Sequence, residues 1–185
     1  MKVIGRFIIH LRHYSRKYGI TITLIGLFVL GIWQIYAKEA WLTYRHYDEI
    51  YAVIENFEKS ISSLKVHQNP EALAEIATGK YLEFLNQTIC QECPSTVLVA
   101  TNVNIEHLRV LDYKKDFARV FARVEVAWVQ MRFSTQETEG GCQATASEGI
   151  YHFVKEDGYW KVSGGEKVRT DTWTPLEGLR NKVCP

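Results

Sequence analysis

Hydrophobic and polar positions divide the chain into three successive patterns. Residues 19–37 carry no charge over nineteen positions, and a helix of that length, rising about 1.5 Å per residue, can cross a hydrocarbon core of about 30 Å. Apolar residues then recur at alternating steps of three and four, which is typical of one helix face. From Ser95 the period becomes two, as in strands. The pattern therefore predicts an apolar helix, a helical region and a sheet, in that order.

The helical region is expected to begin with one long helix over residues 38–67, a stalk that also supplies the first helix of the domain. Its apolar stripe consists of Tyr47, Ile50, Ile54, Phe57, Ile61 and Leu64. This spacing also fits a coiled-coil seam, but the flanking positions lack paired charges, so packing on a sheet is favoured. Asn69-Pro70-Glu71 predicts a second helix, because Asn caps helices and proline is accepted at the first helical position. That helix is expected to end at Gly79, before a short third helix that ends near Thr88.

Four strands are expected after Ser95. The first, residues 96–111, is long and bent, and the second, residues 117–131, alternates between an apolar face and a mixed face. The last two form a hairpin across an Asp-Gly turn, and Trp160 is expected to be buried at the closed end of the sheet. Helices before a single change of period and strands after it indicate an α+β fold: three helices on a curved four-stranded antiparallel sheet.

Charge around the apolar stretch predicts an orientation in a membrane. Residues 1–18 contain five Lys and Arg and no acid, whereas the signs are mixed after residue 37. Basic flanks stay cytoplasmic, so residues 1–18 are predicted to be a cytoplasmic basic segment and residues 19–37 a single transmembrane helix. The remainder would be extracytoplasmic: periplasmic, lumenal or extracellular. A cleaved signal peptide is the alternative, but its apolar region runs only about 7–15 residues.

Composition fits one soluble domain on such an anchor. Hydrophobic residues make up 46% of the chain and aromatic residues 12%, which is ample for a core. The net charge of +1 supplies no basic face, so no nucleic-acid partner is expected. We expect the domain to continue from the first helix through residues 68–168, and residues 169–185 to form a C-terminal tail.

The cysteines all follow the apolar stretch, and they are Cys90, Cys93, Cys142 and Cys184. An even number in an oxidising compartment predicts two disulfides, whose connectivity the sequence does not fix. The close pair also fits a redox dithiol or half of a zinc site. However, a dithiol usually starts a helix after a strand, and zinc would need a second close pair. We therefore expect structural disulfides, with Cys184 holding the tail, and no metal or cofactor.

Two passages resemble known families. The closing hairpin over residues 151–162, with Asp157-Gly158-Tyr159-Trp160-Lys161, is similar to the end of nuclear transport factor 2-like cone-fold domains. Residues 72–82 resemble a segment of the intermembrane-space domain of plastid-division scaffold proteins, and the layout of anchor plus cone also resembles assembly factors of type IV secretion machines. The likeness covers about residues 45–168 and implies a cone-shaped domain on a single-pass anchor. It implies fold more than activity, because this superfamily carries many functions.

The resemblance also indicates where catalytic residues would lie, because enzymes of this superfamily place acids, histidines and tyrosines inside the cone. The candidates are His107, Glu125, Tyr151 and His152. Glu125 shares a strand face with Arg123, which favours a surface ion pair over a general base. His152 lies on an apolar face, which favours a hydrogen-bonded core residue. No triad spacing, phosphate loop or metal-ligand pattern is present in the sequence, so we expect no enzymatic activity.

The sequence therefore favours a non-catalytic, membrane-anchored accessory or scaffold subunit of a larger membrane complex. Its partners would be other integral membrane proteins and membrane lipid. Aromatic residues dominate interface energetics, so the candidates for partner contacts are Trp33, Trp41, Tyr44, Tyr47 and Tyr51. The alternative is a membrane-tethered cone that binds or converts a small apolar ligand, which would require a deep pocket with convergent polar groups.

Overall fold

A computed structural model describes residues 2–89 and 95–173, with the side chains of residues 19, 21, 23–89 and 95–168. The chain divides into two compact units, Met1–Ala40 and Trp41–Pro185, called here the first unit and the domain. Helix α1, Lys2–Ile61, forms the described part of the first unit and begins the domain. The domain continues with α2 (Leu64–Gln68), the 3-10 helix η1 (Pro70–Glu75), α3 (Gly79–Ile89), β1 (Thr96–Tyr113), β2 (Phe117–Arg132), β3 (Gln143–Glu156) and β4 (Tyr159–Trp173).

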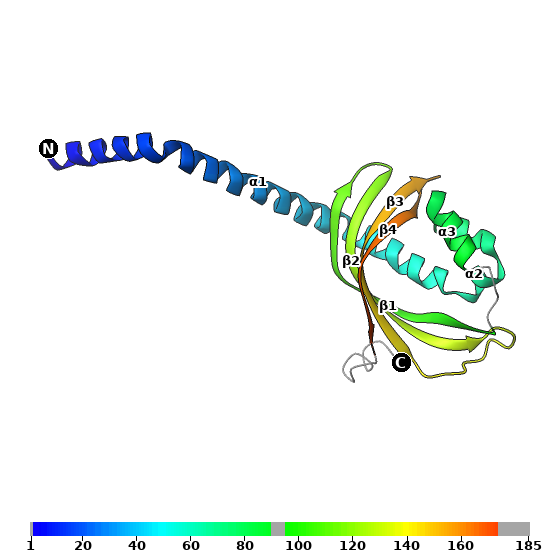
Figure 1. Cartoon of the computed structure of the whole chain (residues 1–185). Coiled ribbons are helices and arrows are strands. Elements are labelled where there is room, and N and C mark those ends of the chain that lie inside the picture. Colours follow the sequence, from blue (N-terminus) through cyan, green and yellow to red (C-terminus); the bar gives the residue numbers. More distant parts are fainter. Residues whose placement is uncertain (1, 90–94, 174–185) are drawn as a thin grey trace. The chain divides into compact units, whose positions relative to one another are not determined.

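The four strands form one antiparallel sheet in the order β1-β2-β3-β4, which confirms the predicted α+β class and the predicted sheet. In Figure 1 the long strands curve, and three elements lie on the same side of them: the C-terminal end of α1, helix α2 and helix α3. Burial alternates along the start of β2, where Ala118, Val120, Ala122 and Val124 are buried and the residues between them are partly exposed. One sheet face therefore forms the core against the helices.

The domain part of α1 packs through the central part of the stripe that the sequence predicted, whereas Tyr47, the first member of that stripe, is exposed. Ile50, Ile54 and Phe57 are buried. The helix nevertheless ends at Ile61, earlier than predicted, and α2 starts separately. Ser62 Oγ donates to the carbonyl of Glu58 at 2.9 Å, and Ser63 Oγ accepts from the N–H of Val66 at 3.4 Å. These hydroxyls compete with the helical backbone and separate the two helices.

The second predicted helix is only partly correct. Asn69 caps it as expected, accepting from the N–H of Glu71 at 3.1 Å, but the segment is a 3-10 helix that ends at Glu75. The following residues pair with β4: the N–H of Val162 donates to Ile76 O at 2.9 Å, and the N–H of Thr78 donates to Val162 O at 3.0 Å. Because the backbone of residues 76–78 is hydrogen-bonded to the edge strand β4, it cannot continue a helix. Gly79, with φ of +59°, begins α3 instead of ending a helix.

The other sheet edge, β1, is held by hydroxyls of the helical region. The pairing of β1 with β2 shifts register at three places, so β1 is bent as expected. Beside two of these shifts, the N–H of Ala100 donates to Ser62 Oγ at 3.3 Å and the N–H of Val110 donates to Thr43 Oγ1 at 2.8 Å. Backbone donors at a bulged edge thereby gain partners.

The final hairpin is longer than predicted. Asp157 and Gly158 have φ values of +52° and +87°, as the expected Asp-Gly turn requires. However, β3 begins at Gln143 and β4 runs to Trp173, so the start of the predicted tail is strand. The rest of the tail, residues 174–185, lies outside the described residues.

In the first unit, α1 carries exposed apolar side chains between Leu24 and Tyr36. Among the described residues, no helix combines the length and apolarity needed to cross a membrane. The predicted transmembrane helix over residues 19–37 therefore has no support from the fold.

The prediction that Trp160 is buried was wrong. Its side chain is only partly buried, because it lies at the sheet edge with its indole against the Tyr113 ring, at a centroid distance of 5.5 Å. Phe153 on β3 is the fully buried aromatic of the hairpin, with no exposed surface.

This difference predicts unequal effects of truncation. Phe153→Ala should lower the free energy of unfolding by about 3–5 kcal/mol, because it leaves a cavity in the core. Trp160→Ala should lower the free energy of unfolding by clearly less than Phe153→Ala does. Urea unfolding of the full chain in a mild detergent, followed by circular dichroism, measures both values. A larger loss for Trp160→Ala would contradict the described packing.

Candidate functional site

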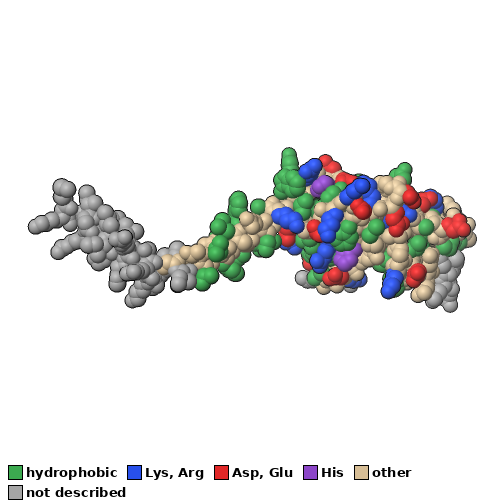
Figure 2. Space-filling view, turned by 90° about the horizontal axis from the view of Figure 1, so that it is seen from above, with side chains coloured by type: hydrophobic (Ala, Val, Ile, Leu, Met, Phe, Trp, Pro, Cys, Tyr) green, Lys and Arg blue, Asp and Glu red, His purple; other side chains and the backbone are tan. Residues whose placement is uncertain are grey.

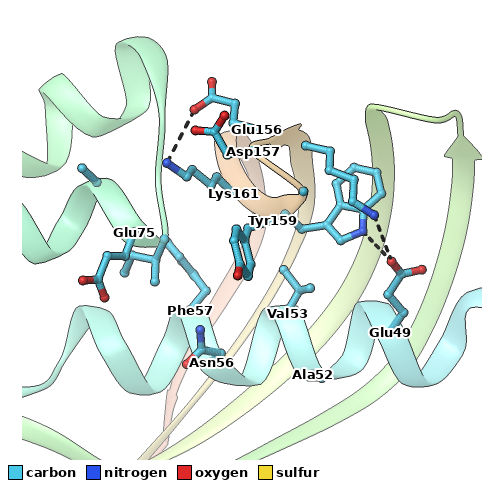
Figure 3. A pocket seen from close by; sticks show the side chains of 15 residues that line it. Glu49, Ala52, Val53, Asn56, Phe57, Glu75, Glu156, Asp157, Tyr159 and Lys161 are labelled. Atoms are coloured by element: carbon cyan, nitrogen blue, oxygen red, sulfur yellow. Dashed lines mark hydrogen bonds and ion pairs between the residues drawn. The ribbon is translucent and has the colours of Figure 1, made fainter.

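A cavity of about 790 Å³ opens between α1, η1 and the β3–β4 hairpin (Figure 3), and we call it the groove. Val53, Phe57 and Ile76 form its apolar floor. Its remaining lining residues are Glu49, Ala52, Asn56, Ala74, Glu75, Lys155, Glu156, Asp157, Gly158, Tyr159, Trp160 and Lys161. The groove therefore joins an apolar floor to a charged rim, which suits recognition of an amphipathic partner or ligand.

Glu49 lies at one end of the groove as an acceptor shared by several donors. Trp160 Nε1 donates to its Oε1 at 2.7 Å, and the Tyr113 hydroxyl donates to its Oε2 at 2.8 Å. His46 Nδ1 lies 3.5 Å from Oε2, and Lys155 Nζ lies 3.8 Å from Oε1. Figure 3 shows the Glu49 side chain rising from the helix, with dashed lines from its carboxylate to two neighbouring nitrogen atoms.

Burial alone would raise the pKa of Glu49. The hydrogen bonds from Trp160, Tyr113 and His46, together with the charge of Lys155, outweigh burial and lower that pKa below its ordinary value. A general base is most effective when its pKa lies near the working pH. The carboxylate of Glu49 therefore acts as a fixed anion that orders the site and is a poor proton acceptor.

Lys155, Glu156 and Lys161 of the hairpin are also paired. Lys161 Nζ lies 3.6 Å from Glu156 Oε2, while Glu156 Oε1 accepts from the Thr78 hydroxyl at 2.7 Å. Lys155 Nζ, besides approaching Glu49, lies 5.2 Å from the centroid of the Trp160 ring. These pairs hold the hairpin against α1 and against Thr78, the residue before α3, and they make the groove a preformed surface.

A second, smaller cavity of about 210 Å³ lies between α1, α3 and the two last strands, and we call it the inner cavity. Its polar centre is the pair of Glu58 and Tyr151, whose hydroxyl donates to Glu58 Oε1 at 2.8 Å. Burial raises the pKa of Glu58 above its ordinary value, although the hydrogen bond from Tyr151 opposes this shift. Burial and the nearby Glu58 also raise the pKa of Tyr151 and of Tyr81.

The candidate catalytic residues do not converge. Tyr151 lines the inner cavity, whereas the next residue, His152, faces the other side of the sheet, 3.5 Å from Glu166 and against the ring of Phe117. His152 is therefore not the core histidine that was favoured. His107 is exposed at a register shift of β1, with φ of +52°.

Glu125 is paired with Arg123 as expected, but not at the surface. Glu125 is only 5% exposed, and its Oε1 lies 3.5 Å from Arg123 Nε. Asn104 Nδ2 donates to its Oε2 at 3.2 Å, and Arg123 also donates to Glu148 at 3.1 Å. Burial of a charge is costly unless it is paired, so this network stabilises the outer sheet face.

The aromatic residues proposed for partner contacts are mostly exposed. In the domain, Tyr44 is 88% exposed, and Trp41 and Tyr47 are also exposed. Tyr51 is partly buried, with its ring 5.8 Å from that of Tyr47. Trp33, in the first unit, is 69% exposed. Figure 2 shows hydrophobic side chains along the helix of the first unit and mixed charges over the domain surface. Whether these aromatics contact partners stays a prediction.

Of the cysteines, the structure describes Cys142, which is disulfide-bonded. Cys90, Cys93 and Cys184 lie outside the described residues, so pairing of all four stays a prediction. Within the described part of the chain, no three His, Cys, Asp or Glu side chains are grouped as metal ligands.

The two carboxylates that organise the cavities, Glu49 and Glu58, were missed by sequence reasoning. Each directly neighbours a buried stripe residue, Ile50 and Phe57 respectively. An acid next to the apolar stripe of a helix is the signal that could have found them, because such a side chain starts at the boundary of the core.

Comparison with known proteins adds one structural likeness. No protein-family model and no curated protein sequence matches the chain. The crystal structure of the intermembrane space region of the chloroplast protein ARC6 is similar, with 13% identity and a TM-score of 0.48. The alignment covers 66% of this chain and 94% of that one. The sequence also resembles an intermembrane-space domain, that of plastid-division scaffold proteins. A structural likeness of this size, however, carries no conclusion about function.

The environment of Glu49 predicts a pH-dependent effect. Its folded-state pKa is lowered, so its contribution to stability is present above its unfolded-state value and is lost as the pH falls through the folded-state value. Glu49→Gln should therefore unfold at lower urea than the wild type at pH 7, and the gap should shrink below about pH 4.5. Asp48→Asn, at an exposed neighbouring position, is the control. A gap that stays constant from pH 7 to pH 3 would contradict the role assigned to the charge.

The environment of Glu58 predicts a pH effect on stability that is opposite in sign to that of Glu49. Because its folded-state pKa is raised, ionisation destabilises the fold, and stability is lost as the pH rises through the folded-state value. Relative to wild type, Glu58→Gln should gain resistance to urea between pH 4 and pH 8, since Gln can still accept from Tyr151. Glu83→Gln, on the exposed side of α3, should show no such trend. Equal pH profiles for wild type and Glu58→Gln would rule out the shift.

Proposed function

We propose that this protein is a non-catalytic accessory or scaffold subunit of a membrane protein complex. The observation that carries the proposal is an aromatic row on the domain part of α1, formed by Trp41, Tyr44, Tyr47 and Tyr51. Its first three members are exposed, whereas Ile50 and Ile54 on the same helix are fully buried. Trp41, Tyr44 and Tyr47 therefore lie where the domain itself leaves the helix uncovered, whereas Tyr51 packs against the core.

Aromatic side chains on one exposed helix face support a role in binding. The spacing of three, three and four residues keeps them on one side of the helix. Large aromatics bury much area at small cost in conformational entropy, and they are over-represented where interfaces gain most of their free energy. The guanidinium of Arg45 lies 5.1 Å from the centroid of the Trp41 ring, which adds a cation to the row.

The first unit supports a membrane location for this subunit. Leu27, Phe28, Leu30, Trp33 and Ile35 are all more than half exposed although they point to different sides of one helix. A helix that is apolar on every side is normally covered by lipid or by protein. We therefore infer that residues 19–37 lie in a bilayer, with the basic residues 1–18 on its cytoplasmic side and the domain on the other.

The pairing of charges in the groove supports a binding role over a chemical one. Glu49 has a lowered pKa and Glu156 is held by Lys161 and Thr78. Fixed ions of this kind serve as recognition elements on a rigid surface. The second candidate function is a small-ligand domain, and the inner cavity with Glu58 and Tyr151 is the observation that favours it.

A native gel after mild solubilisation tests the proposal. The wild-type chain should migrate in a complex much larger than its 21.4 kDa, and the double variant Tyr44→Ser with Tyr47→Ser should shift to lower mass. The control is Phe84→Ser with Leu98→Ser, because these residues are exposed elsewhere on the domain. If the wild-type chain migrates alone, the scaffold proposal fails and the small-ligand function moves ahead.

A carbonate wash of membranes tests the location. The wild-type chain should stay in the membrane pellet, and Leu27→Arg with Leu30→Arg should release it, since each charge at the centre of a span costs about 2.5–3.5 kcal/mol. Full release of the wild-type chain would exclude an integral anchor.

A further inference from the structure

We propose that the groove binds an extended, basic peptide segment of a partner protein, which adds as a short strand to the outer edge of β4 at Trp160. This rests on the proposed binding function and deepens it, because it names the site and the kind of segment that a partner would insert. Three independent features of the groove carry it: an open strand edge, an apolar floor and an excess of carboxylates.

The register of the hairpin shows which backbone groups face outward. Glu156 and Tyr159 flank a two-residue turn and pair with each other, and Lys155 pairs with Trp160. In such a hairpin the pair next to the turn exchanges hydrogen bonds, whereas the following pair directs its N–H and C=O groups away from the partner strand. Consistently, the N–H of Lys155 donates away from β4, to Asp116 O at 2.9 Å. The N–H and C=O of Trp160 therefore point to the outer edge of β4.

The same edge already accepts a strand two residues further along. Val162 has the same orientation as Trp160, and its N–H and C=O bond to Ile76 and Thr78 in a parallel bridge. The covering segment leaves the edge where η1 ends at Glu75. Ala74, Glu75 and Trp160 all line the groove, so the edge of Trp160 opens into it. An extended segment placed there would continue a pairing that the chain itself begins.

The floor of the groove suits alternate side chains of such a segment. An extended peptide directs every second side chain to one side, and Val53, Phe57 and Ile76 offer apolar surface below the edge. Tyr159 stands above the helix in Figure 3, between the hairpin and the floor. A cavity of about 790 Å³ has room for a segment of a few residues.

The rim selects the charge of the segment. Four carboxylates line the groove (Glu49, Glu75, Glu156 and Asp157) against two ammonium groups (Lys155 and Lys161), a formal excess of two negative charges. The two lysines lie beside Glu49 and Glu156. Lys65, which does not line the groove, places its Nζ 3.4 Å from Glu75 and reduces the excess to one negative charge; Asp157, at the exposed turn, supplies it. Complementary charge then favours a segment with Lys or Arg between apolar residues.

The test is binding of a fluorescein-labelled peptide, acetyl-Lys-Val-Lys-Val-Lys-amide, to the full chain in a mild detergent, measured by fluorescence anisotropy. We expect saturable binding below about 1 mM. The acidic peptide Glu-Val-Glu-Val-Glu, and the basic peptide with N-methyl groups on its backbone nitrogens, should bind at least about tenfold more weakly. Amide hydrogen exchange gives the decisive readout: the basic peptide should slow exchange at the Trp160 amide about tenfold and leave that of Thr78 unchanged.

Matched variants separate the groove from the rest of the domain. Ala74→Trp fills the groove from η1 and should abolish binding, whereas Glu71→Trp lies on the same helix outside the groove lining and should not. Asp157→Asn removes a rim charge and keeps a residue that accepts positive φ, so it should weaken binding and reduce its salt dependence.

The outcomes distinguish this proposal from the function on which it rests. No binding of the basic peptide up to about 1 mM, or binding without protection of the Trp160 amide, would overturn strand addition. On the native gel, Ala74→Trp should release the chain from its complex. If only the variant of Tyr44 and Tyr47 releases it, the scaffold function stands and the groove proposal fails.

Discussion

The carboxylate of Glu49 is the point on which the architecture of the domain depends. Its helix, the end of β1 and the β3–β4 hairpin meet there, through the hydroxyl of Tyr113, the indole of Trp160 and the ammonium group of Lys155. Hydrogen bonds to an ionised acceptor are about twice as strong as neutral ones. They fix the distance between α1 and the hairpin, which are two walls of the groove, so the shape of the groove follows from this one anion.

Two acids on the same helix show how environment decides chemistry. Glu49 lies at the edge among several donors, and its pKa is lowered, whereas Glu58 is desolvated beside a single phenol, and its pKa is raised. The first is an ion at neutral pH that organises neighbouring side chains. The second keeps its proton to a higher pH than an exposed glutamate does, and a protonated carboxyl group can both donate and accept a hydrogen bond. The outer groove and the inner cavity therefore differ in character although one helix lines both.

Local patterns in the sequence predicted the parts of the fold that local physics determines. The period-two alternation located the strands, Asp157-Gly158 located the turn because both positions need positive φ, and the spacing of Ile50, Ile54 and Phe57 located the core face of α1. The break after Ile61 was missed because serine is acceptable in a helix until its hydroxyl finds a backbone partner. Partners far along the chain left no pattern: Tyr151 and Glu58 are 93 positions apart, and the pairing of residues 76–78 with Val162 spans a similar length.

The closure of β4 by residues 76–78 also has a consequence for biosynthesis. A ribosome releases the helices of the domain first, and the hydrogen-bonding partner of Ile76 and Thr78 lies on the last strand of the sheet. Each neighbouring pair of strands can form as soon as its second strand has emerged, but the backbone of residues 76–78 stays unpaired until Val162 is available. Such distant pairing slows folding and prolongs exposure of apolar segments. The helical part of this domain can therefore complete its pairing with the sheet only after all four strands have been synthesised.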